Sequence, residues 1–509
     1  MTKATTLTID NFRAIEHVEV ALHDLTVITG RNNAGKSTLL EALRLLYKDR
    51  AWDETADRPH DDDSKACCIR LDFGDETHVQ LEVEAGGKPC WTDGSQTSAK
   101  PLGHVADGDL VFIPSQLRLD DVAKNTASSP FTKLIAAAVS GAVAKGSEVA
   151  GHLAKARDEL VGDERLRSVF AEFEDRLAGW EIALVPDVRA PSAEDIVKQW
   201  MGLSATDNGR EVSVDQLGSG AQRAIAFAMI QTLAATASPG SDDAFESPRL
   251  LLFEEPEAFL HPGQIDALRR DVEELAAGDY QPIVTTHSPR FLAGGLEKLS
   301  TIARLHRDGG VTTSRQLTED RLAELLSTDF MFGELPEDET QEERHELEEF
   351  KLRHLMSGDR SSAFLAARVL LVEGDTELAL LGYLRSTGRL EFPVDTEVLD
   401  TVGKFNMPRV IALFGELGIP GSVLYDKDSA KKGNKKHVYA NERIEALAAE
   451  YGWAADGFEE FLEHDLGLDG DARSKPVRVV HACADGEVDH DRLDELCARV
   501  EALVGTEPR

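Results

Sequence analysis

The stretch Gly30-Arg31-Asn32-Asn33-Ala34-Gly35-Lys36-Ser37 decides the fold of the N-terminal part of the chain. It matches the pattern GxxxxGK[ST], with an apolar strand before it and leucines at helical spacing after it, as this phosphate-binding motif requires. The backbone N–H groups of such a loop and the dipole of the following helix favour phosphate oxygens. We therefore expect Lys36 to bind the β- and γ-phosphates of ATP and Ser37 to hold Mg²⁺. The nucleotide-binding residues expected here are Gly30, Asn32, Asn33, Gly35, Lys36, Ser37 and Thr38.

A second motif, Leu-Leu-Leu-Phe-Glu-Glu-Pro-Glu at 250–257, is an apolar strand that ends in paired carboxylates. We expect Glu254 to act on Mg²⁺ through water and Glu255 to polarise the attacking water as general base. The next strand ends in Thr285-Thr286-His287-Ser288-Pro289. Its position after the paired carboxylates indicates that His287 senses the γ-phosphate.

A third motif, residues 217–223 with the sequence Leu-Gly-Ser-Gly-Ala-Gln-Arg, resembles the signature of ABC ATPases, which contacts the nucleotide held by the opposite subunit. The resemblance gives Ser219 and Gly220 as nucleotide contacts and implies at least a homodimer. With Asn11-Phe12-Arg13 and the order of the motifs, residues 1 to about 320 resemble the ATPase of the SMC-like, RecF-like and OLD (overcoming lysogenization defect) group. Glu254 stands where many ABC proteins carry Asp, whereas OLD-type ATPases commonly have Glu-Glu.

Composition and periodicity change along the chain. Residues 118–180 have Ala-rich helical periodicity, which favours an inserted arm or dimerisation element within an ATPase domain spanning 1–330. The acidic segment 331–365 is interpreted as a solvated helical linker. A new apolar strand at Val369 begins a second domain, 366–509.

Acidic residues follow two apolar strands of this second domain. Val369-Leu370-Leu371-Val372 leads into Glu373, and Ser422-Val423-Leu424-Tyr425 leads into Asp426 and Asp428. Side chains at i and i+2 of a strand share a face, so Asp426 and Asp428 are expected to point together. With Glu373 they could form a site for Mg²⁺ or Mn²⁺, which prefer oxygen ligands.

Strand–Glu-Gly followed by strand–Asp-x-Asp resembles the TOPRIM fold of topoisomerases, primases and OLD-family nucleases, over roughly 366–480. The resemblance implies that Glu377 and Glu463 are further metal-site carboxylates and that Lys475 approaches the scissile phosphate. The expected fold class is α/β: an ABC/SMC-like P-loop ATPase with a helical insertion, followed by a smaller α/β TOPRIM domain.

The net charge of −37 argues against a nucleic-acid partner, since the average surface repels phosphate. A local exception is the lysine cluster formed by Lys427, Lys431, Lys432, Lys435 and Lys436. Beside a metal site this cluster is what a phosphate backbone needs, although a solvated loop is its usual meaning. Five scattered cysteines and the lack of a long apolar run indicate a cytoplasmic protein.

The resemblance implies an ATP-regulated, divalent-metal-dependent DNA endonuclease similar to OLD-family enzymes, including the nuclease subunit of Gabija-type phage defence. Glu255, Glu373, Asp426, Asp428 and Lys475 are its expected catalytic residues. Three alternatives stay open: an RNA substrate, a SMC/RecF-like repair ATPase that binds DNA without cutting, and an ATPase scaffold or sensor that holds a partner effector. Phosphate contacts carry no sequence information, so the lysine cluster does not distinguish DNA from RNA.

Overall fold

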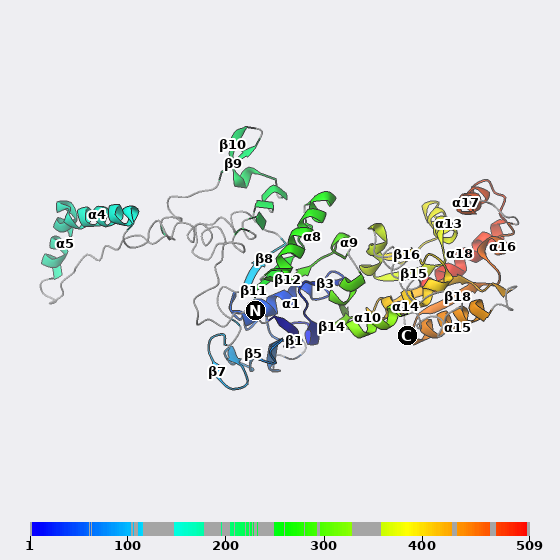
Figure 1. Ribbon diagram of the computed structural model, residues 1–509, viewed down its shortest axis with the longest axis horizontal. Helices are drawn as coiled ribbons and strands as arrows, with labels where there is room; N and C mark the ends of the chain where they lie inside the picture. The colour runs from blue at the N-terminus through cyan, green and yellow to red at the C-terminus, as the bar shows by residue number, and fades with distance from the viewer. Residues whose placement is uncertain are drawn as a thin grey trace. The chain divides into compact units, whose positions relative to one another are not determined.

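The computed structural model forms two compact units, which are described separately (Figure 1). The first comprises Met1–Ile113, Phe245–Glu257 and His261–Arg509, and the second comprises Pro114–Ala244 and Ala258–Leu260. The structure describes residues 3–60, 62, 64–102, 105, 110–115, 147–177, 195, 204–207, 209–218, 220–222, 224–225, 227–228, 232, 249–258, 260–278, 280–292, 296–327, 358–429, 435–468 and 475–505.

The larger sheet of the first unit has twelve strands within these described residues, in the order β7-β6-β5-β4-β1-β2-β14-β13-β3-β12-β11-β8. The strands β8, β11, β12, β3 and β13 are parallel, whereas β1 and β2 and the strands from β4 to β7 pair antiparallel. The strand bounds are β1 Ala4–Phe12, β2 Ile15–Ala21, β3 Thr26–Gly30, β4 Cys67–Phe73, β5 His78–Val83, β6 Cys90–Thr92, β7 Thr97–Ser98, β8 Leu110–Ile113, β11 Arg249–Glu254, β12 Tyr280–Thr285, β13 Ile302–Asp308 and β14 Val311–Gln316.

The burial of these strands follows their place in the sheet. Every residue of β3 and β12 is buried, as expected for parallel strands covered on both faces. In β4 and β5 buried residues alternate with more exposed ones, because one face of an antiparallel sheet can meet solvent. Helix α1 (Lys36–Leu46) buries its leucines against this sheet, and α8 (Pro262–Ala276) packs beside β12 (Figure 1). These contacts position the loop between β3 and α1.

The smaller sheet is parallel throughout, in the order β16-β15-β17-β18. Its strands are β15 Arg368–Val372, β16 Thr396–Asp400, β17 Gly421–Asp426 and β18 Ala454–Phe458. The helices of this region are α13 Asp375–Ser386, α14 Met407–Glu416, α15 Lys435–Glu450, α16 Leu462–Asp465, α17 Lys475–Ala484 and α18 His490–Gly505. Helices α13 and α17 pack side by side (Figure 1). The carboxyl ends of these parallel strands share one edge, which brings their acidic residues into one region.

One hydrophobic core contains residues from both sides of the expected acidic linker. Leu292 and Leu325 share it with Phe364, Val369 and Phe414. Most of that linker, residues 331–357, lies outside the described residues, and its described part begins with the short helix η4 (Gly358–Phe364).

A buried arginine also joins the two sheets. Arg304 on β13 donates through Nη1 to Gly418 O and through Nη2 to Ala366 O, both at 2.9 Å. Burial lowers the pKa of Arg304 to about 10. The larger and smaller sheets are therefore joined by packing and by hydrogen bonds.

The second unit contains part of the expected helical arm. Helices α4 (Glu148–Gly162) and α5 (Glu164–Leu177) lie within 118–180, and the rest of that range is largely outside the described residues. The hairpin of β9 (Ser204–Asp207) and β10 (Arg210–Ser213) precedes the expected signature. Val149, Leu160 and Val169 are exposed, and a role for the arm in dimerisation remains a prediction. None of the described helices combines the length and apolar character that crossing a membrane would require.

Candidate functional site

The phosphate-binding loop needs glycine at its two ends. Gly30 has φ +142°, and a Cβ there would lie 2.4 Å from the Leu305 carbonyl oxygen. Gly35 has φ +104°, and its Cβ would lie 2.9 Å from the Thr312 side chain. Both positions are crowded as well as in a region that favours glycine. This local backbone explains why the motif has glycines at these positions.

The ammonium group of Lys36 makes hydrogen bonds that it can exchange for a ligand. Its Nζ donates to Gly30 O at 2.9 Å and to Arg31 O at 3.1 Å, and lies 2.7 Å from His287 Nε2. Burial lowers the pKa of Lys36, against the opposing charges of Glu255, Glu257 and Glu254. Burial, with the charge of Lys36, also lowers the pKa of His287, so a neutral imidazole can accept a hydrogen bond from the lysine ammonium. The lysine and the predicted γ-phosphate sensor therefore lie together.

The carboxylates of the second motif face the same loop. Ser37 Oγ donates to Glu254 Oε1 at 2.5 Å, so the two predicted Mg²⁺-binding groups are adjacent. Glu255 has φ +43°, and its Oε1 lies 3.6 Å from His287 Nε2. Glu257 Oε1 accepts the backbone N–H of His287 at 2.6 Å, and burial raises the pKa of Glu257. Glu257 thus fixes the backbone of His287, a contact that the sequence motif did not indicate.

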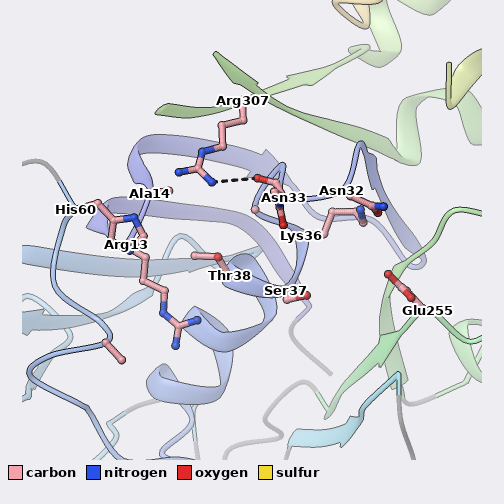
Figure 2. Close-up of a pocket in the computed structure, with 12 residues that line it drawn as sticks. Arg13, Ala14, Asn32, Asn33, Lys36, Ser37, Thr38, His60, Glu255 and Arg307 are labelled. Atoms are coloured by element: carbon pink, nitrogen blue, oxygen red, sulfur yellow. Dashed lines mark hydrogen bonds between the residues drawn. The ribbon is translucent and has the colours of Figure 1, made fainter. Parts of the chain in front are cut away.

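A pocket of about 800 Å³ opens beside this loop (Figure 2). Figure 2 shows Glu255 across from Lys36 and Ser37, and Arg307 Nη1 joined to Asn33 O, a contact of 3.4 Å. The pocket lining comprises Arg13, Ala14, Asn32, Asn33, Gly35, Lys36, Ser37, Thr38, Ala56, His60, Glu255 and Arg307. A cavity of this size with three cationic side chains fits a nucleoside triphosphate.

Sequence reasoning did not identify Arg13, His60 and Arg307 as lining residues of this pocket. Arg13 lies just after β1, and its guanidinium is held by the fully buried Asp57 at 2.8 Å. Arg307 enters from β13, more than 250 residues from the loop. The motif Asn11-Phe12-Arg13 was the one local signal for these residues, and it could have indicated that Arg13 lies at the nucleotide pocket. Of the predicted signature residues, Gly220 belongs to the second unit, and Ser219 lies outside the described residues.

A second, acidic pocket of about 450 Å³ lies at the carboxyl ends of β15, β16 and β17. Glu373 and Asp426 come from the ends of β15 and β17, and Glu377 from the first turn of α13. The lining comprises Arg360, Glu373, Gly374, Asp375, Thr376, Glu377, Asp400, Val402, Gly403, Asp426, Glu463 and Lys475. The structure thus brings together five of the six residues predicted for this site.

The electrostatics of the acidic pocket suit a divalent cation that prefers oxygen ligands. Burial, and next the charges of Glu373 and Glu377, raise the pKa of Asp426 to about 8. Burial raises the pKa of Glu377 to about 7 and also raises that of Glu373. Within the described residues, Asp426 Oδ1 is buried and has no hydrogen-bond partner. Crowded carboxylates that resist ionisation are stabilised when a divalent cation supplies positive charge.

The carboxylates do not form a finished coordination shell. Within the part of the chain that the structure describes, no group of three or more His, Cys, Asp or Glu side chains is arranged to hold a metal ion. Mg²⁺ keeps several waters and commonly uses one or two carboxylates. The donor set therefore fits such an ion: one or two of Glu373, Glu377, Asp426 and Glu463 would hold it directly, and the others through its waters.

Asp428 lies differently from the expectation that it points with Asp426. Strand β17 ends at Asp426, and Asp428 has φ +51°, so the strand alternation does not extend to it. Its Oδ2 accepts from Lys404 Nζ at 3.0 Å and lies 2.9 Å from His437 Nδ1. Asp428 is absent from the lining of the acidic pocket. The backbone turn after β17 directs it towards a buried lysine instead.

Two positive groups, one that lines the acidic pocket and one behind its carboxylates, were missed from the sequence. Arg360 Nη2 donates to Asp400 Oδ2 at 2.7 Å, and Lys404, only 2% exposed, also donates to Asp426 O. The predicted Lys475 lies 3.2 Å from Glu463 Oε1 and lines the pocket. A signal for Lys404 was available, because Thr401-Val402-Gly403-Lys404 follows directly after β16.

The lysine cluster is described only in part. Lys427 Nζ pairs with Glu459 at 3.3 Å, and α15 begins at Lys435 and includes Lys436. Lys431 and Lys432 lie outside the described residues. A role for this cluster in binding nucleic acid remains a prediction.

Glu377→Gln is expected to gain stability relative to the wild type as the pH rises. The folded pKa of Glu377, about 7, exceeds its ordinary value of 4.5, so the unfolded chain ionises first and the folded wild type loses stability across this window. The difference should grow by roughly 1 kcal/mol per pH unit and level off above the folded pKa. Chemical unfolding of both proteins with a chelator present measures it, and parallel stability curves would contradict the buried acid.

Comparison with family models assigns both parts of the chain. An AAA ATPase domain model matches residues 3–136, and a further AAA domain model matches 113–293. The model of the TOPRIM domain of overcoming lysogenization defect-like proteins matches 364–428, which includes Glu373 and Asp426. The fold class expected from the motifs is confirmed.

Characterised relatives extend the likeness over most of the chain. The OLD nuclease of Thermus scotoductus (strain ATCC 700910 / SA-01) is 25% identical over 532 residues, covering 93% of each protein. The Old nuclease of Escherichia phage P2 is 23% identical over 479 residues, covering 84% of this chain and 77% of the relative.

Solved structures are more distant. The SMC head domain of Thermotoga maritima is 14% identical with a TM-score of 0.33, covering 62% of this chain and 99% of that domain. The Smc head domain of Pyrococcus furiosus, with its extended coiled coil, is also 14% identical, with a TM-score of 0.41, covering 64% and 99%.

Proposed function

Because the chain belongs to the OLD family of ATPase–TOPRIM nucleases, we propose that it is a divalent-metal-dependent DNA endonuclease regulated by ATP. The observation that carries this proposal is the acidic pocket, where Glu373, Glu377, Asp426 and Glu463 face one cavity together with Lys475. The family resemblance implies phage defence or DNA processing as the setting.

In the nuclease pocket the acidic residues bind the cation and a lysine binds the phosphate. Bound Mg²⁺ or Mn²⁺ supplies the activation of water and the stabilisation of the leaving oxygen in phosphodiester hydrolysis. Glu373, Glu377, Asp426 and Glu463 hold the cation. Lys475, half exposed and 3.2 Å from Glu463, is placed to bind a non-bridging phosphate oxygen. Lys404 stays with Asp428 and offsets part of the negative charge beneath the site.

The ATPase residues act at a second pocket. Lys36 exchanges its contacts with Gly30 O, Arg31 O and His287 for the phosphates of ATP, and Ser37 and Glu254 hold the nucleotide's Mg²⁺. Glu255 orients the attacking water, and His287 contacts the γ-phosphate. Ser219 and Gly220 complete the site of a second subunit, so a homodimer is the smallest competent assembly.

Plasmid nicking tests this proposal directly. Supercoiled DNA is incubated with the full chain, with Mg²⁺ or Mn²⁺ or a chelator, and with or without ATP. We expect nicked product only when metal is present, and a rate that changes with ATP. Cleavage of RNA alone would make the substrate class wrong. Metal-dependent DNA binding without any cleavage would favour a non-cutting repair ATPase, and activity only with a co-purifying protein would favour the scaffold.

A further inference from the structure

The short helix η4 lines the acidic pocket with one residue and, with the next residue, contacts the loop that follows His287. Arg360 lines the acidic pocket, and Ser361 contacts the loop that follows His287. All of these residues belong to the first compact unit. Neither Arg360 nor Ser361 belongs to the motifs from which the two activities were inferred. Their adjacency is the starting point for a link between ATP and the nuclease site.

At the acidic end, Arg360 holds an acid that the sequence analysis missed. Its Nη2 donates to Oδ2 of the buried Asp400 at 2.7 Å. Arg360 Nη1 is buried without a hydrogen-bond partner among the described residues, so the guanidinium has donor capacity left for a water or a phosphate oxygen. A change in the position of Arg360 would therefore alter both Asp400 and the positive charge at the pocket wall.

Asp400 is connected through the backbone to one of the metal-site carboxylates. It ends β16, which pairs in parallel with β15. The next residues bond to the end of β15: Thr401 N donates to Val372 O at 3.0 Å, and Gly403 N donates to Glu373 O at 2.8 Å. The segment after Asp400 thus holds the backbone of Glu373.

At the nucleotide end, Ser361 is fully buried and its Oγ donates to Pro289 O at 3.3 Å. Pro289 begins helix α9 (Pro289–Leu292), two residues after His287, whose Nε2 lies 2.7 Å from Lys36 Nζ. A γ-phosphate that both groups bind would compete with this lysine–histidine contact for their hydrogen bonds. A displacement of His287 by the phosphate would also move the loop that carries Pro289.

Packing makes η4 a stiff connection. Helix α9 packs on η4, and Leu292 shares a core with Ala363 and Phe364. Phe364 also lies against Phe414, with ring centroids 4.7 Å apart. Because close-packed cores transmit displacement instead of absorbing it, a shift of α9 is passed to η4.

We propose that η4 couples the nucleotide pocket to the nuclease pocket, with Arg360 as the positioning residue that orients Asp400 and the segment behind Glu373. The inference rests on the proposed function and deepens it, since it names the route by which ATP regulates cleavage. The route runs from His287 through Pro289 and Ser361 to Arg360.

Amide hydrogen exchange of the full chain tests the route without relying on activity. Exchange at Thr401 and Gly403 is followed with and without adenosine 5′-(β,γ-imido)triphosphate and Mg²⁺. We expect nucleotide to change these exchange rates by about fivefold or more in the wild type, the lower range of coupling between protein sites. Amides of the phosphate-binding loop report nucleotide binding in the same experiment.

Three test variants and one control variant separate coupling from general damage. Ser361→Ala and Arg360→Gln should reduce the nucleotide response to less than about twofold, while nucleotide still protects the loop. Arg360→Lys keeps the charge and should restore part of the response. The matched control is Ser362→Ala, which removes the same group one residue away, where Ser362 Oγ donates to Glu397 at 3.1 Å. This control should respond like the wild type, and the ratio of nicking rates with and without nucleotide should follow the same order.

The outcomes are distinguishable. A full response in Ser361→Ala and Arg360→Gln would overturn the route and leave an ATP-regulated nuclease intact. No response at Thr401 and Gly403 in the wild type, with the loop protected and nicking insensitive to nucleotide, would overturn both the route and ATP regulation. Loss of the response in Ser362→Ala as well would show general damage to η4 and would also overturn the specific role of Ser361.

Discussion

Asp426→Asn is expected to lower metal-dependent cleavage by at least about a hundredfold and to leave ATP hydrolysis near the wild-type rate. Even outer-shell partners of metal ligands cost roughly ten- to a hundredfold when they are mutated, so loss of a direct ligand should reach the upper end. Asp426 has the most strongly raised pKa of the pocket acids, at about 8, and a buried oxygen without a partner among the described residues. The ATPase residues line a different cavity.

The same electrostatics separate this loss from misfolding. With a pKa near 8, Asp426 is mostly protonated at neutral pH without metal, so Asn resembles the resting side chain. Folding should therefore be unchanged at neutral pH, and at higher pH the variant should be slightly more stable, because Asn cannot ionise beside the other carboxylates. The substitution should therefore weaken only metal binding and metal-dependent cleavage, which need the ionised carboxylate.

Nicking rates and a Mn²⁺ titration measure the effect. Asp456→Asn is the matched control, since Asp456 lies on β18 of the same sheet, pairs with Arg499 at 2.9 Å and does not line the pocket. The control should cleave at the wild-type rate. Wild-type cleavage by Asp426→Asn would show that the acidic pocket is not the nuclease site.

The sequence predicted those parts of the site whose geometry is local. The spacing of Gly30, Gly35 and Lys36 determines a backbone turn that needs little help from the rest of the chain. The apolar strands before Glu254 and Glu373 deliver their carboxylates to strand ends, where the structure has them. The short contact between Ser37 and Glu254 follows, since β3 and β11 are both parallel neighbours of β12.

Residues that depend on long-range packing were not predictable in this way. Arg360 and Asp400 meet only because η4 and β16 pack together, 40 residues apart in the chain. Lys404 reaches Asp428 across the gap between two strand ends. The shared direction expected for Asp426 and Asp428 assumed that strand alternation continues, whereas the backbone turns to a positive φ at Asp428. A pattern of residue types does not show where a strand stops.

Lys36→Ala is expected to weaken ATP binding by at least about tenfold and to abolish ATP hydrolysis. Hydrogen bonds that involve a charged group contribute about 1.5–3 kcal/mol each, which corresponds to roughly ten- to a hundredfold in affinity. Removing the ammonium also leaves Gly30 O and Arg31 O without that donor, so thermal unfolding must confirm that the variant folds. Lys88→Ala, at an exposed position outside the pocket, is the matched control.

The decisive measurement on Lys36→Ala is cleavage as a function of ATP. If ATP regulates the nuclease through this pocket, the variant should cut DNA at one rate whatever the ATP concentration, and that rate should equal the wild-type rate without ATP. The acidic pocket is unchanged in this variant, so its metal dependence should also be unchanged. Retained ATP binding would show that the loop is not the nucleotide site, and retained ATP sensitivity without binding would place the regulatory nucleotide elsewhere.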